Sequence, residues 1–381
     1  MKNKIYIDEE KLFYDCDVLY SMPETGFELS RTKEYVKKAL RAMGVECKDT
    51  GKCGITATLG QGEKCVLLRA DMDALELDGK GPFHGCGHHM HTAMLLGAAR
   101  ILKANENKLK NTVKLMFQPA EETLEGAVDM LASGVLHNPK PEAAFMLHVA
   151  TATDFPAGTL IFPSEGEIAP AVEYFRIKIE GMGCHGAQPH MGYDPIIPAC
   201  HIVTAFENIN ARELPSAENS VLTIGSIHGG NAANAIPTEV VISGTLRSYS
   251  MATIDFVKKR LLTITENICQ AFRTKGTIAY TGGAPTFLCS GKVLNRAMDI
   301  SEKVFGKEKI VNSSELKSNQ KNAGSEDFAY VSHKIPTIMA SLSAGSKQDG
   351  YVYPLHHPEV RFDKKALPAG STFLAYMGME Y

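Results

Sequence analysis

The densest group of side chains that could bind a metal ion lies in the segment His84-Gly-Cys-Gly-His-His-Met-His91. It contains a cysteine and four of the thirteen histidines of the chain. Thiolate and imidazole groups bind zinc and its neighbours, and the glycine between Cys86 and His88 lets both side chains turn toward one point before a helix that we expect to begin at Thr92. The pattern indicates a metal site. A histidine-rich surface loop with an inert buried cysteine is the alternative.

A pair of adjacent carboxylates, Glu121 and Glu122, could supply further metal chemistry. Neighbouring carboxylates repel each other unless a cation lies beside them, so one could bind a metal while the other serves as a base. The alternative is a solvated acidic helix start, because acidic residues favour helix N-termini. His148 and His356 carry weight only if they converge on the same site, since a lone histidine is more often a hydrogen-bonded core residue.

The elements that must position these residues are three apolar runs, which we predict to be strands of a parallel or mixed sheet: residues 65–70, 113–117 and 143–147. The first run leads to Asp71 and Asp73, the second to the two glutamates, and the third to His148. In open α/β sheets, ligands bind beyond the carboxyl ends of the strands. Three strands that end in acid or imidazole therefore predict one shared site.

The pattern along the chain indicates two domains, one inserted in the other. Residues 172–286 follow the order βαββαβ, which predicts a ferredoxin-like α+β unit. The α/β pattern resumes after this unit, so residues 1–171 and 287–381 are expected to form the larger domain. A chain of 381 residues is also too long for one ordinary hydrophobic core.

Composition limits the kind of partner. The 40 basic and 43 acidic residues give a net charge of −3, which offers no electrostatic reason to expect nucleic acid or a membrane and favours a small molecule. The start of the chain has no apolar signal segment, and no later run reaches the roughly 20 apolar residues of a membrane span, so we expect a cytoplasmic protein. The nine cysteines are scattered and odd in number, which favours reduced thiols over disulfides.

A set of motifs along nearly the whole chain resembles the M20 metallopeptidase family. The resemblance is strongest to its amidohydrolase branch, which includes N-acyl-amino-acid deacylases, hippurate hydrolases, auxin-conjugate hydrolases and N-acetyldiaminopimelate deacetylase. The motifs follow one another in the order of that family: Leu68-Arg-Ala-Asp-Met-Asp-Ala-Leu75, His84-Gly-Cys-Gly-His-His-Met-His91, Phe117-Gln-Pro-Ala-Glu-Glu122, Leu147-His-Val149, Cys184-His-Gly-Ala-Gln-Pro-His190, Asn234-Ala-Ile-Pro237, Gly244-Thr-Leu-Arg247, Gly324-Ser-Glu-Asp-Phe328 and Leu355-His-His-Pro358.

The resemblance implies a site for two divalent metal ions. Zinc suits the thiolate best, while manganese, cobalt and nickel are compatible with the other ligands. The residues that match the family's ligands are Cys86, His88, Glu122, His148 and His356. Cys86 stands where most relatives outside this branch have a bridging aspartate. Glu121 matches the general base, which takes a proton from water and returns it to the leaving amine. Asp71 and Asp73 match carboxylates that orient the ligands.

The resemblance also implies the fold class: α/β, with a mixed-sheet zinc-peptidase-like catalytic domain and an inserted ferredoxin-like α+β domain that acts as lid and dimerisation domain. His185 matches an imidazole that stabilises the oxyanion, often in the active site of the partner subunit. Asn234 and Arg247 match substrate-binding residues, and a guanidinium suits the carboxylate of an amino acid. For Arg247 the alternative is a solvated surface charge. The expected assembly is a homodimer through the lid domain.

The chain departs from the family pattern at three places. His89 stands where relatives of this branch usually have aspartate, which exchanges an anion for a neutral or cationic group. Residues 20–24, Tyr-Ser-Met-Pro-Glu, replace a histidine-rich stretch, and residues 280–285 lack a common double proline. These departures concern the substrate and the preferred metal more than catalysis.

The principal hypothesis is a dinuclear metal hydrolase that cleaves the amide of an N-acyl-amino acid and releases a carboxylic acid and a free amino acid. A dipeptidase or aminopeptidase on the same scaffold is the alternative within enzymes. A catalytically silent, metal-dependent binding protein is the alternative outside them, because His89 alters the metal loop. A thiol-switched enzyme is a further alternative, since the sulfur of Cys86 is oxidisable. The acyl group cannot be read from the sequence.

Overall fold

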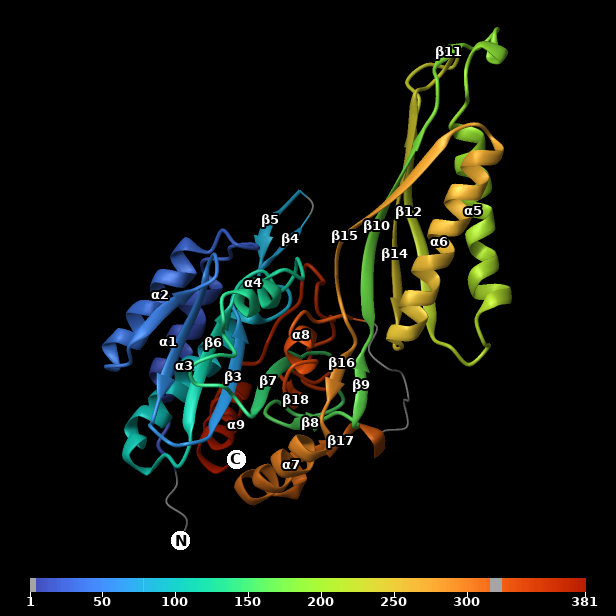
Figure 1. The fold of residues 1–381 in the computed structure, drawn as a ribbon. Helices are drawn as coiled ribbons and strands as arrows, with labels where there is room; N and C mark the ends of the chain where they lie inside the picture. Colours follow the sequence, from blue (N-terminus) through green and yellow to red (C-terminus); the bar gives the residue numbers. More distant parts are fainter. Residues whose placement is uncertain (1–4, 78, 316–323) are drawn as a thin grey trace. The chain divides into compact units, whose positions relative to one another are not determined.

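The computed structural model describes residues 5–77, 79–315 and 324–381 and divides them into two compact units (Figure 1). The first unit contains the described residues up to 168, residues 287–315 and residues 326–381. The second unit contains residues 169–286 together with Gly324 and Ser325. Each unit has its own apolar core, so the second is an insertion in the chain of the first.

The first unit is built on a mixed sheet, which comprises eight strands among the described residues, in the order β1-β2-β6-β3-β7-β18-β8-β17 (Figure 1). Its central strands β6, β3, β7 and β18 are parallel, whereas β2 and β8 pair antiparallel to them. The strands are β1 (Cys47–Thr50), β2 (Gly54–Leu59), β3 (Cys65–Asp71), β6 (Thr112–Gln118), β7 (Ala143–Ala150), β8 (Leu160–Phe162), β17 (Ile310–Asn312) and β18 (Thr337–Ser343). The predicted mixed α/β fold is confirmed.

The central strands are buried on both faces, which explains their nearly continuous apolar sequences. Every residue of β3 and β6 is buried, as expected for parallel strands covered by helices. Asp71 pairs with Gln118 in the register of these two strands, so their carboxyl ends lie level with each other. The residues that follow both strands therefore start from the same edge of the sheet.

Helices complete the first unit: α1 (Glu9–Tyr20), α2 (Ser30–Ala42), α3 (His88–Ala104), α4 (Gly126–Ala132), α7 (Gly291–Phe305), α8 (Ala329–Ser332) and α9 (Leu367–Glu380). Helix α3 packs against α1, α9 and β3, and nearly all of its residues are buried. Short strands connect these elements: β4 (Leu75–Leu77), β5 (Gly81–Phe83), β9 (Gly166–Ala169) and β16 (Phe287–Cys289). None of the helices in the described ranges is long and apolar enough to cross a membrane.

Helix α3 begins at His88, so the expected start at Thr92 was wrong. The residue before the helix, Gly87, has a φ of 86°, a left-handed conformation that glycine adopts without strain. A Cβ at this position would lie 2.3 Å from Cγ2 of Val149. The glycine therefore lets the chain turn directly into the helix, and this places His88 and His91 in the first turn.

The second unit contains an antiparallel sheet in the order β12-β14-β10-β15, with four strands among the residues that are described. The order along the chain is β10 (Ala171–Glu180), α5 (Ile196–Asn208), β12 (Ser220–Gly229), β14 (Glu239–Ser248), α6 (Met251–Ala271) and β15 (Lys275–Ala284). Both helices contribute to the apolar core beneath the sheet, through residues such as Phe206 and Leu261. The two-residue strands β11 (Cys184–His185) and β13 (Ala235–Ile236) pair with each other.

Candidate metal centre

Five potential ligands, predicted from distant parts of the sequence, come together in the first unit. Cys86 precedes α3, His88 opens it, Glu122 follows β6, and His148 lies within β7 near its carboxyl end. His356 lies on the loop between β18 and α9. Their donor atoms form overlapping groups in which all atoms lie within 4.8 Å of one another, among them Cys86–His88–His148 and Cys86–Glu122–His356.

Sulfur and imidazole nitrogens meet at Cys86. Its Sγ lies 3.5 Å from Nε2 of His148 and 3.3 Å from Nε2 of His356. The thiol is buried, and burial raises its pKa although His88 lowers it. A buried thiol of this kind loses its proton only when positive charge lies beside the sulfur.

Two of the imidazoles are held in one tautomer by main-chain carbonyl groups. Nδ1 of His88 donates to the carbonyl oxygen of Asp73 (2.9 Å), and Nδ1 of His148 donates to that of Val149 (2.8 Å). A carbonyl only accepts, so the proton is on Nδ1 in both rings. Burial lowers the pKa of His148 to about 4, which keeps this ring neutral. The ring of His148 therefore presents an unprotonated Nε2 as a ligand. Burial lowers the pKa of His88, but Asp71 and Cys86 outweigh it and hold that pKa well above the ordinary value, so a metal ion would have to displace the Nε2 proton of His88.

Two buried atoms that could bind a metal ion have no hydrogen-bond partner among the described residues. They are Nε2 of His88 and Oε1 of Glu122, which lie 3.8 Å apart. Oε1 of Glu122 also lies 3.7 Å from Nε2 of His356. Buried polar atoms without partners are costly, and a divalent cation between nitrogen, oxygen and sulfur donors removes this cost. The residues therefore fit a metal centre.

Glu121 lies beside this group, and its carboxylate forms a further candidate group with His88 and Glu122. The residue is 6% exposed, and its Oε2 lies 3.8 Å from Nε2 of His88. Burial and the nearby carboxylate of Glu326 raise the pKa of Glu121 well above the ordinary value, while His88 lowers it. Such a carboxylate binds a proton readily, as a general base must.

The carboxylates of Asp71 and Asp73 accept hydrogen bonds from groups that neighbour the proposed ligand atoms. Oδ1 of Asp71 accepts from Nδ1 of His91 (2.6 Å), and its Oδ2 accepts from Nη1 of Arg69 (2.8 Å). Burial alone would raise the pKa of Asp71, but His88, His91 and Arg69 outweigh it and hold that pKa well below its usual range. Oδ2 of Asp73 accepts from the main-chain N–H of Glu122 (3.1 Å).

The sequence interpretation gave no role to His91 or Arg69, although both touch Asp71. Nε2 of His91 accepts from the main-chain N–H of Val149 (2.8 Å), so its Nδ1 carries the proton that Asp71 accepts. Burial lowers the pKa of His91 to about 4, so the ring is neutral. A signal was present for each residue: His91 follows His88 at helical spacing, and Arg69 is a charge inside an apolar run.

His89 is a buried, neutral member of an aromatic cluster. Its ring centroid lies 4.9 Å from that of Tyr20, 5.0 Å from that of His84 and 5.6 Å from that of Phe362. Burial and the neighbouring histidines lower its pKa well below the ordinary value. Of the two states left open by the sequence, neutral and cationic, the structure favours the neutral one. His89 and Tyr20, which belong to separate departures from the family pattern, are in contact here.

The other predicted site residues belong to the second unit. His185 and Asn234 lie next to each other, because the main-chain N–H of Gly186 donates to the carbonyl oxygen of Asn234 (2.8 Å). Nδ1 of His185 accepts from the N–H of Ala187 (3.1 Å). Arg247, on β14, donates from Nη1 to Oγ of Ser325 (3.0 Å).

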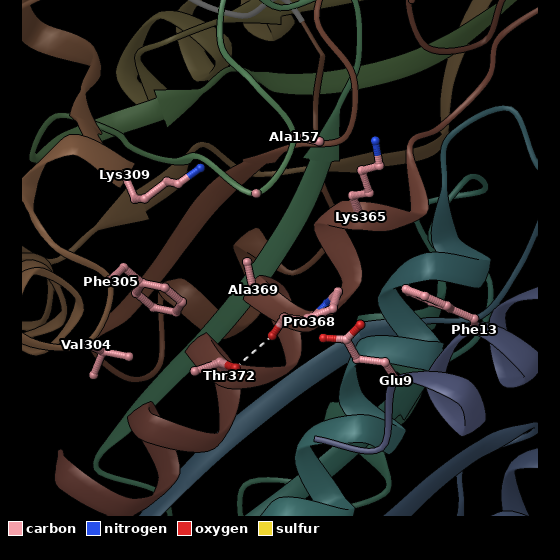
Figure 2. Close-up of a pocket in the computed structure, with 11 residues that line it drawn as sticks. Glu9, Phe13, Ala157, Val304, Phe305, Lys309, Lys365, Pro368, Ala369 and Thr372 are labelled. Carbon is pink, nitrogen blue, oxygen red and sulfur yellow. Dashed lines mark hydrogen bonds between the residues drawn. The ribbon is translucent and has the colours of Figure 1, made fainter. Parts of the chain in front are cut away.

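A surface cavity of about 490 Å³ in the first unit is separate from the metal centre (Figure 2). Figure 2 shows the side chains of Lys309 and Lys365 beside an apolar floor, where Thr372 donates to the carbonyl oxygen of Pro368 (2.7 Å). None of the described residues that line it is a predicted site residue: Glu9, Phe13, Ala157, Gly158, Val304, Phe305, Lys309, Lys365, Pro368, Ala369 and Thr372. The cavity therefore has no part in the chemistry described above.

Comparison with known proteins gives consistent matches over nearly the whole chain. Residues 67–380 match the model of peptidase family M20/M25/M40. The N-acetyl-L-cysteine deacetylase of Bacillus subtilis (strain 168) is 34% identical over 93% of this chain and 84% of that protein. The IAA-amino acid hydrolase ILR1-like 4 of Arabidopsis thaliana is 32% identical over 95% of this chain and 84% of that protein.

A solved structure matches the whole fold. The Bacillus subtilis YXEP protein, described as a dinuclear metal binding peptidase from the M20 family, superposes with a TM-score of 0.77 and 26% identity. The match covers 97% of each chain.

The fold, the cluster of donor atoms and these matches define a metal-dependent hydrolase of amide bonds, with a centre for two divalent cations. The chain belongs to peptidase family M20/M25/M40. The resemblance found in the sequence motifs is thereby confirmed, and so is the expectation of an enzyme.

Proposed function

We propose that the protein hydrolyses the amide bond of N-acyl-amino acids and releases a carboxylic acid and a free amino acid. The observation that carries this proposal is that the potential metal-binding atoms of five residues lie close together, with the carboxylate of Glu121 beside them. Two of these atoms are buried without a hydrogen-bond partner among the described residues. The names of the relatives support the substrate class, because they describe a deacetylase of an acetylated amino acid and a hydrolase of amino-acid conjugates.

The proposed ligands of the two cations are Cys86, His88, Glu122, His148 and His356. When bound, two such cations polarise the scissile carbonyl and make a water molecule more acidic. Zinc is the proposed metal, because a thiolate is among the ligands; manganese, cobalt and nickel suit the remaining ones. The carbonyl groups that accept from Nδ1 of His88 and His148 keep both rings oriented with Nε2 toward the site.

Glu121 is the proposed general base. Its carboxylate accepts a proton from the attacking water while the water oxygen bonds to the carbonyl carbon of the substrate. When the carbon–nitrogen bond breaks, the carboxyl group returns the proton to the amine nitrogen, and the carboxylate is restored. The raised pKa of Glu121 suits both steps, since the group must first bind the proton and then release it to an amine.

The inserted residues 172–286 are proposed to act as the lid and dimerisation domain, and residues 1–171 and 287–381 as the catalytic domain. Nδ1 of His185 is an acceptor, so the proton is on Nε2, where an exposed imidazole can donate to an oxyanion in a partner subunit. Asn234 and Arg247 are proposed to bind the substrate, with the guanidinium facing its carboxylate. A homodimer in the cytoplasm is the proposed state of the enzyme.

A substrate screen tests the function. The purified full chain, loaded separately with zinc, manganese or cobalt, is offered N-acetyl, N-benzoyl and N-indolylacetyl amino acids beside dipeptides with a free amine. We expect release of free amino acid from at least one acyl series, with dipeptides cleaved more slowly. A clear preference for dipeptides would replace the proposal with a peptidase activity. Binding of acyl-amino acids without any cleavage would indicate a binding protein.

A further inference from the structure

The motif Gly324–Phe328 carries two acidic residues for which the proposed reaction has no use. Glu326 and Asp327 are 5% and 0% exposed. Both contact the guanidinium of Arg69, which is itself buried in the middle of the sheet. Burying charged groups costs free energy, so these acidic residues are expected to have a role that depends on their contacts with Arg69.

Glu326 holds the guanidinium of Arg69 at two points. Its Oε1 accepts from Nη2 (2.8 Å), and its Oε2 accepts from Nη1 (3.2 Å). Gln118 accepts from Nε (3.0 Å), and Asp327 lies 3.4 Å from Nη2. Oε1 of Glu326 also accepts from the main-chain N–H of Phe328 (2.9 Å), which fixes the carboxylate itself. A two-point contact sets the plane of the guanidinium and not only its distance.

The guanidinium of Arg69 also connects Glu326 to residues near the metal centre. Its Nη1 donates to Oδ2 of Asp71 (2.8 Å), and the other oxygen of Asp71 accepts from Nδ1 of His91 (2.6 Å). Nε2 of His91 accepts from the main-chain N–H of Val149 (2.8 Å), which is the residue after the ligand His148. An unbroken series of hydrogen bonds therefore runs from Glu326 to the strand end that carries His148.

Carboxyl groups outnumber guanidinium groups around this series. One guanidinium, that of Arg69, faces the carboxylates of Asp71, Glu326 and Asp327. The carboxylate oxygens of Glu121, Glu326 and Asp327 lie within 4.8 Å of one another. Carboxylates this close repel one another, and the guanidinium of Arg69 lies where it offsets that repulsion. The two-point contact with Glu326 sets the orientation of the guanidinium at this place.

We propose that Glu326 is a positioning residue of the hydrolase, acting through Arg69, Asp71 and His91 on the ligand His148. The proposal rests on the proposed function in one respect, which is that His148 is a metal ligand. Glu326 touches neither a proposed ligand nor the base by a hydrogen bond; its effect is on how the ligands are held. Residues that orient metal ligands in this way typically change metal affinity or activity by about 10–100-fold when they are replaced.

The test uses Glu326→Ala and Glu326→Gln in the full chain. Zinc affinity is measured on metal-stripped protein by competition with a chromogenic chelator, and kcat and KM are measured on the zinc-loaded enzyme. We expect Glu326→Ala to weaken zinc binding and to lower kcat, each by about 10–100-fold, with KM nearly unchanged. Glu326→Gln keeps the oxygen that faces Nη2 of Arg69, so its affinity and kcat should fall between those of Glu326→Ala and the unaltered chain.

Asp15→Asn is the matched control, because Asp15 is also fully buried and pairs with an arginine, Arg100, away from the metal centre. It should lower the melting temperature as Glu326→Ala does while leaving zinc affinity unchanged. Equal zinc affinity in Glu326→Ala and the unaltered chain would overturn the proposal, as would an equal loss in Asp15→Asn. An unaltered chain that binds zinc but cleaves no acyl-amino acid would refute the proposed function alone, since the zinc titrations would still decide the role of Glu326.

Discussion

Two adjacent carboxylates of the metal centre differ in what surrounds them. Oε1 of Glu122 lies 3.8 Å from Nε2 of His88 and 3.7 Å from Nε2 of His356, within a ring of potential ligands. Glu121 lies close to His88 and also to the acidic pair of Glu326 and Asp327. The first environment suits a metal ligand, whereas the second suits a group that binds and releases a proton.

Replacement of Glu121 by glutamine separates these two roles. The amide keeps the shape of the side chain but cannot accept a proton from water, so we expect turnover to fall by at least about 10²–10⁴-fold. Bound metal, measured by elemental analysis after gel filtration, should remain close to that of the unaltered chain. Glu122→Gln should lose metal together with activity. A Glu121→Gln variant that turns over normally would exclude Glu121 as the base.

At the scale of the element, the entry into α3 decides where two ligands lie. Gly87 turns the chain with a φ of 86°, and His88 is the first residue of the helix that follows. The space beside Gly87 is filled by Val149, which belongs to the strand that carries His148. The left-handed backbone of Gly87 and its close packing against Val149 therefore both fix where α3 begins.

Gly87→Ala should disturb the protein more than the same substitution at a glycine with open space beside it. The new Cβ would lie 2.3 Å from Cγ2 of Val149 in a left-handed conformation, so we expect a loss of about 1–3 kcal/mol in the free energy of unfolding and weaker zinc binding. Gly350→Ala is the matched control: its φ is 85°, and nothing lies within 4 Å of the added atom. It should lose only about 1 kcal/mol and keep its zinc affinity. Urea unfolding and chelator competition measure both effects, and equal losses in the two variants would contradict this account of α3.

At the scale of the whole molecule, the proposed catalytic groups are divided between two compact units. The potential metal ligands and Glu121 belong to the first unit, and His185, Asn234 and Arg247 belong to the second. A chain of this kind can complete its active site with a residue of a second copy. The proposed homodimer is therefore expected to be needed for catalysis and not only for assembly.

Mixing two inactive variants tests this shared site. In a dimer of one Glu121→Gln chain and one His185→Ala chain, a single site contains both an intact Glu121 and an intact His185 from the partner subunit. Random exchange of subunits should therefore restore about a quarter of the activity of the unaltered enzyme. The variants are unfolded and refolded together, and separately refolded samples serve as the control. No recovery in a mixture shown to contain mixed dimers would mean that His185 does not act across subunits.

The chemistry of the site was readable from the sequence because it depends on residue types. The cysteine, histidines and glutamates lie in short motifs, and the apolar runs before them predict strands whose carboxyl ends share one edge of a sheet. The mixed α/β fold follows from the same runs. The start of α3 was misplaced because the left-handed conformation of Gly87 depends on packing against Val149, which no local pattern reveals.

Only the tertiary structure decided how the charges are balanced. Arg69 and Glu326 are 257 residues apart, and their contact depends on how Glu326 and the following helix α8 pack against the sheet. Likewise, the neutral state of His89 follows from burial among aromatic rings, and its residue type alone left the charge open. Motifs specify which atoms can react, because that is a property of each side chain. Burial and long-range contacts determine the protonation and orientation of those atoms, because these depend on every neighbour that the fold supplies.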